Sequence, residues 1–72
     1  MNKLAYYRRK HNLSQRDLAK LIGVSPSHIA MVETNRIKPS LDVALRLAKV
    51  LEVKVEDLFD LPNNDNTPAA SR

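Results

Sequence analysis

The sequence predicts a single all-α domain, and three observations lead to this fold class. No stretch alternates apolar and polar residues for long enough to form a strand, and no Asn-Gly or Asp-Gly pair marks a hairpin. Apolar residues recur instead at spacings of three and four, as on one face of a helix. Serines stand where capped helices would begin, at Ser14, Ser25 and Ser40. A chain of 72 residues suffices for one such domain with a thin core.

The first two helices are bounded by asparagine, serine and glycine. A helix is expected over residues 2–11, and Asn12 ends it because asparagine tolerates the left-handed backbone that closes helices. Ser14 caps the second helix, Asp17 completes a capping-box pattern, and Gly23 suits the left-handed position at the helix end. The inward face of this second helix is predicted to hold Leu18, Ala19, Leu21 and Ile22.

The third helix follows the second after a very short connection. Ser25 is its expected N-cap, and Pro26 suits its first position, where a missing N–H costs nothing. Asn35 ends this helix, and a loop up to Pro39 follows. Because Gly23 lets the chain turn sharply within so few residues, the second and third helices are predicted to form a helix-turn-helix.

A fourth helix and a final helical turn complete the domain. Ser40 caps the fourth helix over residues 41–51, and a fifth helix is expected over residues 55–59, with Leu58 and Phe59 packing inward. The predicted apolar stripe of the fourth helix consists of Leu41, Ala44, Leu45, Leu47, Ala48 and Leu51.

The two ends of the chain differ from this pattern. Residues 62–72 contain no large apolar residue and are predicted to be a disordered tail, which leaves a domain of residues 1–61. The first residues, MNKLAYYRRKHN, place charges where a signal peptide would need an apolar segment. The chain also lacks cysteine. We therefore expect a protein that is not exported, works in the cytoplasm and contacts no membrane.

Charge is distributed unevenly along the chain. Residues 1–38 hold eight Lys or Arg against two acids, a balance of +6, whereas residues 39–61 hold three bases against five acids, a balance of −2. The basic half is expected to face a polyanion, and the acidic half to face water or another protein. A solvated basic face without any partner would give the same pattern.

The outer face of the third helix is unusually neutral. Ile29 and Val32 define its inward side, so Ser27, Ala30, Met31 and Thr34 lie opposite, where most surface helices carry Lys and Glu. Short hydroxyl and methyl-bearing side chains suit a helix that lies in the major groove of DNA, because they allow close approach to base edges. A tolerant surface or a protein contact would also explain this composition.

Several linked motifs resemble one family. The segments L-S-Q-x-D-L-A-x-x-I-G-V-S, I-A-x-V-E, P-S-L-D-x-A-L-x-L-A-x-x-L-E-V and E-D-L-F are similar to those of the Cro/CI-type (XRE) helix-turn-helix repressors, and together they cover residues 4–59. The resemblance implies a five-helix, lambda-repressor-like bundle whose third helix reads the major groove. It also implies a homodimer on a pseudo-palindromic double-stranded DNA operator.

The resemblance also assigns roles to individual residues. It pairs Arg8 with Glu33 in a structural ion pair between the first and third helices. The residues implied to face the bases are Pro26, Ser27, Ala30 and Met31. The residues implied to contact phosphates are Gln15, Ser25, His28, Thr34, Arg36 and Lys38. For Gln15, the alternative is an ordinary first-turn residue.

This chain departs from the family pattern at a few positions. Asn12 and Asn35 stand where glycine is usual, which asparagine tolerates, and Lys54 replaces the usual Ser or Thr cap of the last helix. No Gln, Asn or Arg on the third helix can make a bidentate base contact, so specificity is expected to depend on thymine methyl groups and DNA shape.

The function expected from these residues is sequence-specific transcriptional regulation, with repression as the expected action. His11 and His28 are the only histidines and have no carboxylate at a ligand or triad spacing, so neither an enzyme nor a metal site is expected. No cofactor or small-molecule ligand is expected either. The alternative is an antitoxin-like module whose fourth and fifth helices engage a partner protein. For the homodimer, the contact is expected over residues 51–59.

Overall fold

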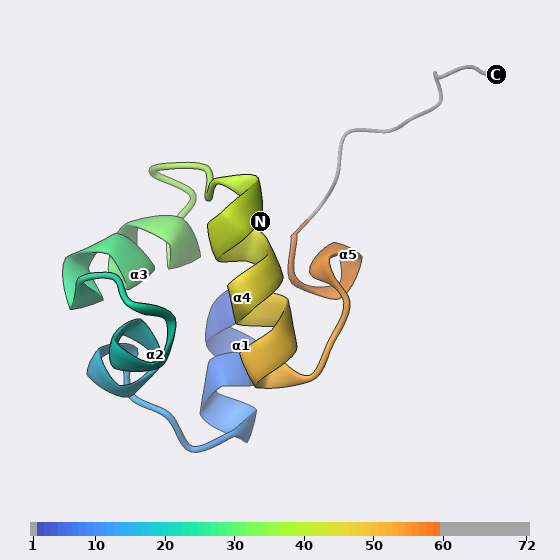
Figure 1. Cartoon of the computed structure of the whole chain (residues 1–72), viewed down its shortest axis with the longest axis horizontal. Coiled ribbons are helices and arrows are strands. Elements are labelled where there is room, and N and C mark those ends of the chain that lie inside the picture. Colours follow the sequence, from blue (N-terminus) through green and yellow to red (C-terminus); the bar gives the residue numbers. More distant parts are fainter. Residues whose placement is uncertain (1, 60–72) are drawn as a thin grey trace, which may run out of the picture.

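The computed structural model describes residues 2–59, and within them it contains helices and turns but no strand. Figure 1 shows α4 across the middle of the molecule, with α2 and α3 on one side and α5 on the other. The predicted all-helical class is confirmed. The predicted tail, residues 62–72, lies outside the described residues. The helices are α1 (Leu4–Lys10), α2 (Gln15–Ile22), α3 (Pro26–Glu33), α4 (Leu41–Leu51) and α5 (Val55–Leu58).

Three serines start the central helices as predicted. The Ser14 hydroxyl accepts the N–H of Asp17 at 2.9 Å, and the Asp17 carboxylate accepts the N–H of Ser14 at 3.0 Å, which completes a capping box. Ser25 and Ser40 cap α3 and α4 in the same way, accepting the third amide of each helix at 3.1 and 3.2 Å. Because these caps are local interactions, the starts of α2, α3 and α4 follow directly from the sequence.

Left-handed residues end most of the helices. Gly23 has φ 79°, and the two predicted asparagines, Asn12 and Asn35, have φ 57° and 61°. Glu52, at the end of α4, is also left-handed with φ 61°, which the sequence did not indicate. A residue with a Cβ and no local partner is strained in this region, so Glu52 costs more than an asparagine would.

The first helix is shorter than predicted, because its ends are held by side chains outside it. The expected range was residues 2–11, whereas α1 covers Leu4–Lys10. The side-chain oxygen of Asn2, which precedes the N-cap residue Lys3, accepts the N–H of Leu4 at 3.0 Å and so satisfies the first amide of the helix. His11 follows the helix, and its Nε2 lies 2.9 Å from the carbonyl oxygen of Leu51.

A compact apolar core joins all five helices. Ile29 and Val32 of α3 are fully buried, as predicted, and Phe59 packs against the same core. The buried cluster consists of Leu4, Leu18, Ala19, Ile22, Ile29, Val32, Leu47, Ala48, Leu51 and Leu58.

The prediction of the core is wrong for three leucines. Leu21, Leu41 and Leu45 are 59%, 73% and 53% exposed. The apolar stripes of α2 and α4 are wider than the surface that their neighbours cover, so the leucines at the margins stay in solvent. Tertiary packing, which periodicity does not reveal, decides which part of a stripe is buried.

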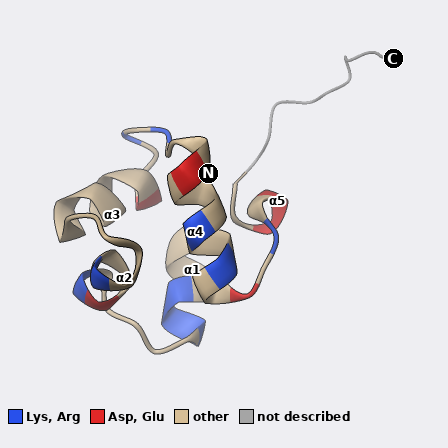
Figure 2. Ribbon diagram, in the orientation of Figure 1, with Lys and Arg blue, Asp and Glu red and all other residues tan. Residues whose placement is uncertain are grey.

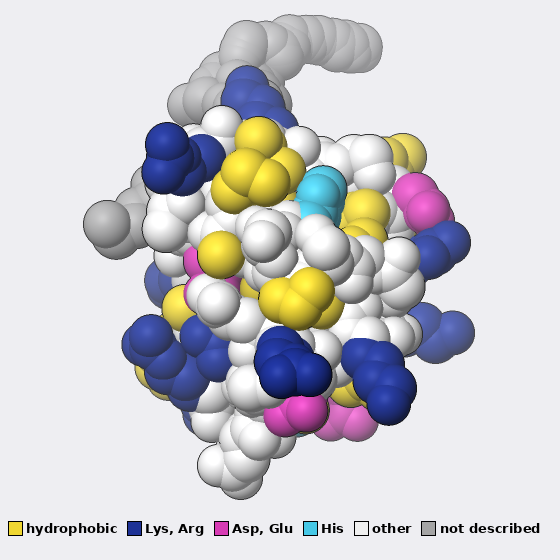
Figure 3. Space-filling view, turned by 90° about the vertical axis from the view of Figure 1, so that its left-hand side faces the viewer, with side chains coloured by type: hydrophobic (Ala, Val, Ile, Leu, Met, Phe, Trp, Pro, Cys, Tyr) yellow, Lys and Arg dark blue, Asp and Glu magenta, His cyan; other side chains and the backbone are white. Residues whose placement is uncertain are grey.

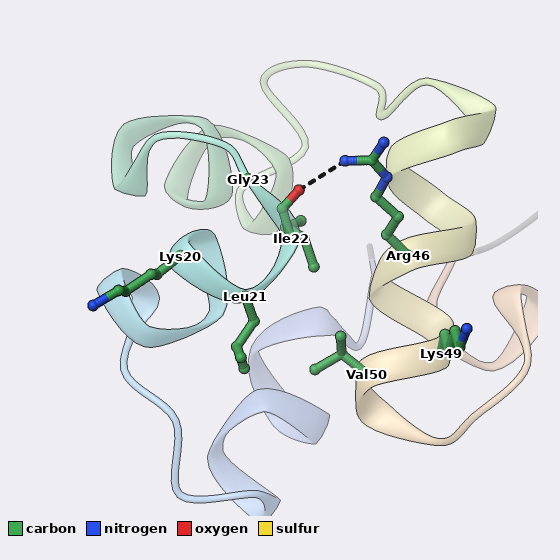
Figure 4. Close-up of a pocket in the computed structure, with 7 residues that line it drawn as sticks. All are labelled: Lys20, Leu21, Ile22, Gly23, Arg46, Lys49 and Val50. Atoms are coloured by element: carbon green, nitrogen blue, oxygen red, sulfur yellow. Dashed lines mark hydrogen bonds between the residues drawn. The ribbon is translucent and has the colours of Figure 1, made fainter.

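Leu21 faces an open groove between α2 and α4. Figure 4 shows Leu21 and Val50 on opposite sides of this groove, with Arg46 above them. The guanidinium of Arg46 donates to the carbonyl oxygen of Ile22 at 3.1 Å and pairs with Asp42 at 3.0 Å. Arg46 therefore ties the last turn of α2, where the sharp corner begins, to the middle of α4.

Candidate nucleic-acid interface

The outer face of α3 is exposed and nearly free of charge. Pro26, Ser27 and Met31 are exposed and Ala30 is half-buried, while Ile29 and Val32 fix the opposite side in the core. In Figure 2, α3 carries acidic colour only at its last residue, Glu33, and no basic colour. The four residues implied to face the bases therefore lie together on a helix anchored by its apolar side.

Charged side chains, mostly cations, surround this neutral face. Figure 3 shows the side of the molecule where α2 and α3 lie, with uncharged side chains in the middle and Lys and Arg side chains around the margin, with a few acidic side chains between them. Arg36 and Lys38, in the loop after α3, are exposed. A neutral centre within a basic margin suits a ligand with a polyanionic backbone and readable edges between its strands.

Gln15 is held by an interaction that the sequence analysis missed. It is the first residue of α2, it is half-buried, and its Nε2 donates to Oε1 of Glu33 at 3.0 Å. This bond uses one of the two amide protons of Gln15, so the other stays available to an incoming anion. Gln15 and Glu33 are 18 residues apart, too far for a local pattern to indicate their contact.

The structure contains the Arg8–Glu33 ion pair that the resemblance implies, and the pair is well shielded. Arg8 Nε donates to Glu33 Oε2 at 2.6 Å and Nη2 to Oε1 at 3.3 Å, while Nη1 donates to the carbonyl oxygen of Leu13 at 2.8 Å. The two side chains are only 10% and 6% exposed. Together with Gln15, this pair connects α1, α2 and the end of α3 in one hydrogen-bonded network.

The other residues implied to contact phosphates differ in what they offer. The Ser25 oxygen caps α3, which leaves its hydroxyl proton free to donate. The Thr34 hydroxyl instead donates within α3, with Ala30 and Met31 carbonyl oxygens at 3.0 and 3.3 Å, so it would have to rotate to reach a phosphate. His28 is half-buried, and its Nε2 is shielded from solvent without a partner among the described residues.

The loop that carries Arg36 and Lys38 is shaped by Asn35 and by a residue far away in the sequence. Arg36 N–H donates to the Met31 carbonyl oxygen at 2.9 Å. The side-chain nitrogen of Asn2 donates to Val32 O at 2.7 Å and to Asn35 Oδ1 at 2.9 Å. The sequence gives no sign of these distant partners of Asn2.

Hydrogen bonds from Ser14, first of all from its backbone N–H, lower the pKa of the Asp17 carboxyl below its ordinary value of 3.8. Within residues 2–59, no cluster of three His, Cys, Asp or Glu is placed to hold a metal ion. None of the helices in this range has the length and apolarity needed to span a bilayer.

Comparisons with known proteins agree with this architecture. A family model described as Helix-turn-helix matches residues 4–58. An uncharacterized HTH-type transcriptional regulator of Methanocaldococcus jannaschii is 52% identical over 58 residues, which are 81% of this chain and 88% of the relative. The regulator YgzD of Bacillus subtilis is 34% identical with the same coverage. The regulator PuuR of Escherichia coli is 29% identical over 92% of this chain but only 36% of its own length.

The matched region contains all five helices and the neutral face of α3 with its basic margin. The chain therefore belongs to the XRE-type helix-turn-helix family of DNA-binding transcriptional regulators.

Proposed function

We propose that the protein is a sequence-specific repressor that inserts α3 into the major groove of double-stranded DNA. The observation that carries this proposal is the exposed, uncharged face of α3 within a margin of cations. A helix with this face can approach base edges closely, while the cations neutralise the flanking phosphates. Repression follows because a domain seated in the groove excludes other proteins from the same stretch of duplex.

The roles of the residues follow from what each can donate. Ser27 offers a hydroxyl to base edges, and Ala30 and Met31 offer apolar contact to thymine methyl groups. Gln15, Arg36 and Lys38 bind phosphates, Gln15 through the amide proton that Glu33 does not use. No catalytic step is assigned to any residue. Because the ligand is DNA, the protein would act in the cytoplasm.

The protein is proposed to bind DNA as a homodimer. The exposed leucines of α4 support a revised location for the contact between the two copies. Leu51 and Leu58, both within the expected contact at residues 51–59, are 1% exposed and belong to the core. Leu41 and Leu45 are exposed and lie one turn apart. At about 100° per residue, both point away from Arg46 and Val50, which face α2 across the groove.

Leu41 and Leu45 therefore lie on the side of α4 that is turned away from the groove with α2, and Figure 1 places α5 across α4 from α2. The same leucines would also serve a partner protein, which keeps an antitoxin-like module as the second candidate.

Selection from random duplexes, followed by fluorescence anisotropy against salt, tests the DNA proposal. A dimer with about six to eight phosphate contacts should give a slope of log K against log[salt] of roughly −5 to −7. Arg36→Ala should weaken specific and non-specific duplexes alike, whereas Lys54→Ala, which removes the same charge on the α5 side, should change little. A slope near zero, or equal effects of the two variants, would overturn the proposal.

A further inference from the structure

The first described residues form a strap between the end of α3 and the end of α5. Asn2 donates its side-chain amide to Val32 O at 2.7 Å and to Asn35 Oδ1 at 2.9 Å. The next residue, Lys3, donates its backbone N–H to the Leu58 carbonyl oxygen at 2.8 Å. The strap therefore connects two helices that lie on opposite sides of α4.

One side chain makes three hydrogen bonds in this strap. The amide nitrogen of Asn2 has two protons, and each has an acceptor, while its oxygen accepts the N–H of Leu4 at 3.0 Å. The side chain of Asn2 is therefore fixed at both of its polar atoms. A fixed amide can in turn fix the direction of the groups that it binds.

Both acceptors lie where α3 ends and the basic loop begins. Asn35 is left-handed, with φ 61°, and it sets the direction in which the chain leaves α3 toward Arg36 and Lys38. A glycine would adopt this backbone with less strain but would give Asn2 no side-chain acceptor. The pairing with Asn2 therefore gives a physical reason for asparagine at this position.

We infer that Asn2 is a positioning residue for DNA binding, acting through Asn35 to aim the phosphate-binding loop. The inference rests on the proposed function, because it assigns Arg36 and Lys38 to phosphates. Asn2 itself need not touch DNA. Its amide holds the loop in one conformation before DNA arrives, so the cations do not have to be ordered during binding.

The central variant is Asn2→Ser. Serine keeps an oxygen for the N–H of Leu4, so the first amide of α1 keeps its acceptor, but its side chain is too short to hold both Val32 O and Asn35 Oδ1. On the selected operator, the affinity should fall at least fivefold. The salt slope should become shallower by about one for each protein chain, as expected when one phosphate contact is lost. Affinities of the wild type and of Asn2→Ser should be measured at a temperature where thermal melts show both proteins to be folded.

A merely structural role would give a different result. If Asn2 only stabilised the fold, Asn2→Ser would lower the melting temperature, but the salt slope and the affinity of the folded protein would stay unchanged. Combining Asn2→Ser with substitutions in the loop provides a second control. When Arg36 and Lys38 are both alanine, Asn2→Ser should cause less than a twofold further loss. A full fivefold loss in that background would overturn the inference.

Hydrogen exchange tests the strap without DNA. The amides of Arg36 and Ile37 donate to the Met31 carbonyl oxygen at 2.9 and 3.4 Å, so they should exchange at least fivefold faster in Asn2→Ser. The amides of Gly23 and Val24, in the turn after α2, should keep their rates. Unchanged rates at Arg36 and Ile37 would overturn the inference. If the wild-type protein bound no DNA at all, the proposed function would fail, and the exchange rates would still decide whether Asn2 shapes this loop.

Discussion

Glu33 is the acceptor on which two other side chains depend. It receives Arg8 Nε at 2.6 Å and Gln15 Nε2 at 3.0 Å, and its side chain is 6% exposed. Removing one partner of a buried pair leaves the other charge without compensation. The network therefore supports the orientation of α3 and holds Gln15 in place at the same time.

We expect Glu33→Ala to lower the free energy of unfolding by about 3 kcal/mol, because Arg8 would keep its charge in a buried site. Denaturant melts of Arg8→Ala, Glu33→Ala and the double variant measure the coupling. Asp42→Ala is the matched control, since its pair with Arg46 is 69% and 54% exposed and should contribute about 0.5 kcal/mol or less. Strictly additive losses at Arg8 and Glu33 would contradict this account.

Asp17 should make the stability of the folded protein depend on pH in the acidic range. Its folded-state pKa lies below the ordinary value of 3.8, mainly because the backbone N–H of Ser14 donates to the ionised carboxylate. The contribution of Asp17 is therefore complete above pH 3.8 and is lost as the pH falls through the folded-state pKa. Thermal melts from neutral to strongly acidic pH should show a smaller acid-induced loss in Asp17→Asn. Identical acid profiles would remove this role.

Sequence was informative at this scale only where partners are close along the chain. The caps at Ser14, Ser25 and Ser40 join residues three apart, so they could be predicted. The Arg8–Glu33 pair was available only through family resemblance. The contacts of Gln15 with Glu33 and of Asn2 with Asn35 span 18 and 33 residues, and no local pattern indicates them.

The recognition element itself can be tested by changing its outer face. Ala30→Glu would bring a carboxylate toward the phosphates, so the affinity for the selected operator should fall by about 1–3 kcal/mol while the melt stays close to wild type. Ala30→Gln, which is similar in size to Ala30→Glu but uncharged, separates the effect of side-chain size from that of charge repulsion.

Met31→Ala should relax the preference at one or two base pairs without weakening non-specific binding. Competition assays on single-base variants measure both effects, and wild-type affinity in Ala30→Glu would exclude α3 as the reading element.

The end of α4 holds a residue that glycine should improve. Glu52 has φ 61°, and leaving the left-handed strain of a non-glycine residue gains about 1–2 kcal/mol, whereas the extra freedom of an unfolded glycine costs about 0.5–1 kcal/mol. The balance predicts that Glu52→Gly raises the free energy of unfolding by about 0.5–1 kcal/mol. Asn12→Gly, also at a left-handed position, should gain less because asparagine tolerates this backbone. Chemical denaturation should rank the two variants in this order, and a loss in Glu52→Gly would contradict it.

At the scale of the whole molecule, the exposed leucines predict how copies associate. Leu41→Glu or Leu45→Glu should convert the proposed dimer to a monomer in sedimentation equilibrium at micromolar concentration, because a carboxylate would be buried in the contact. Leu21→Glu is the matched control, since Leu21 is 59% exposed but faces the groove between α2 and α4. A wild-type monomer whose footprint covers a single half-site would contradict the dimer.

The architecture was predictable to a greater extent than its surfaces. Five helices and the sharp corner at Gly23 follow from caps, turn residues and apolar spacing. Which margin of an apolar stripe is covered depends on neighbours that the spacing does not identify, and Leu41 and Leu45 were misplaced for this reason. The two leucines that the core prediction misplaced are the same ones that support the proposed contact between copies.

The neutral outer face of α3 has a consequence for how this regulator can change during evolution. Ser27 and Met31 are exposed and make no part of the buried cluster, so substitutions there need not disturb the fold. In the proposed complex, a long polar side chain at either position could make a bidentate base contact that the present residues do not make. A duplicated copy could therefore diverge to a new operator through single substitutions, without first passing through a variant that has lost its stability.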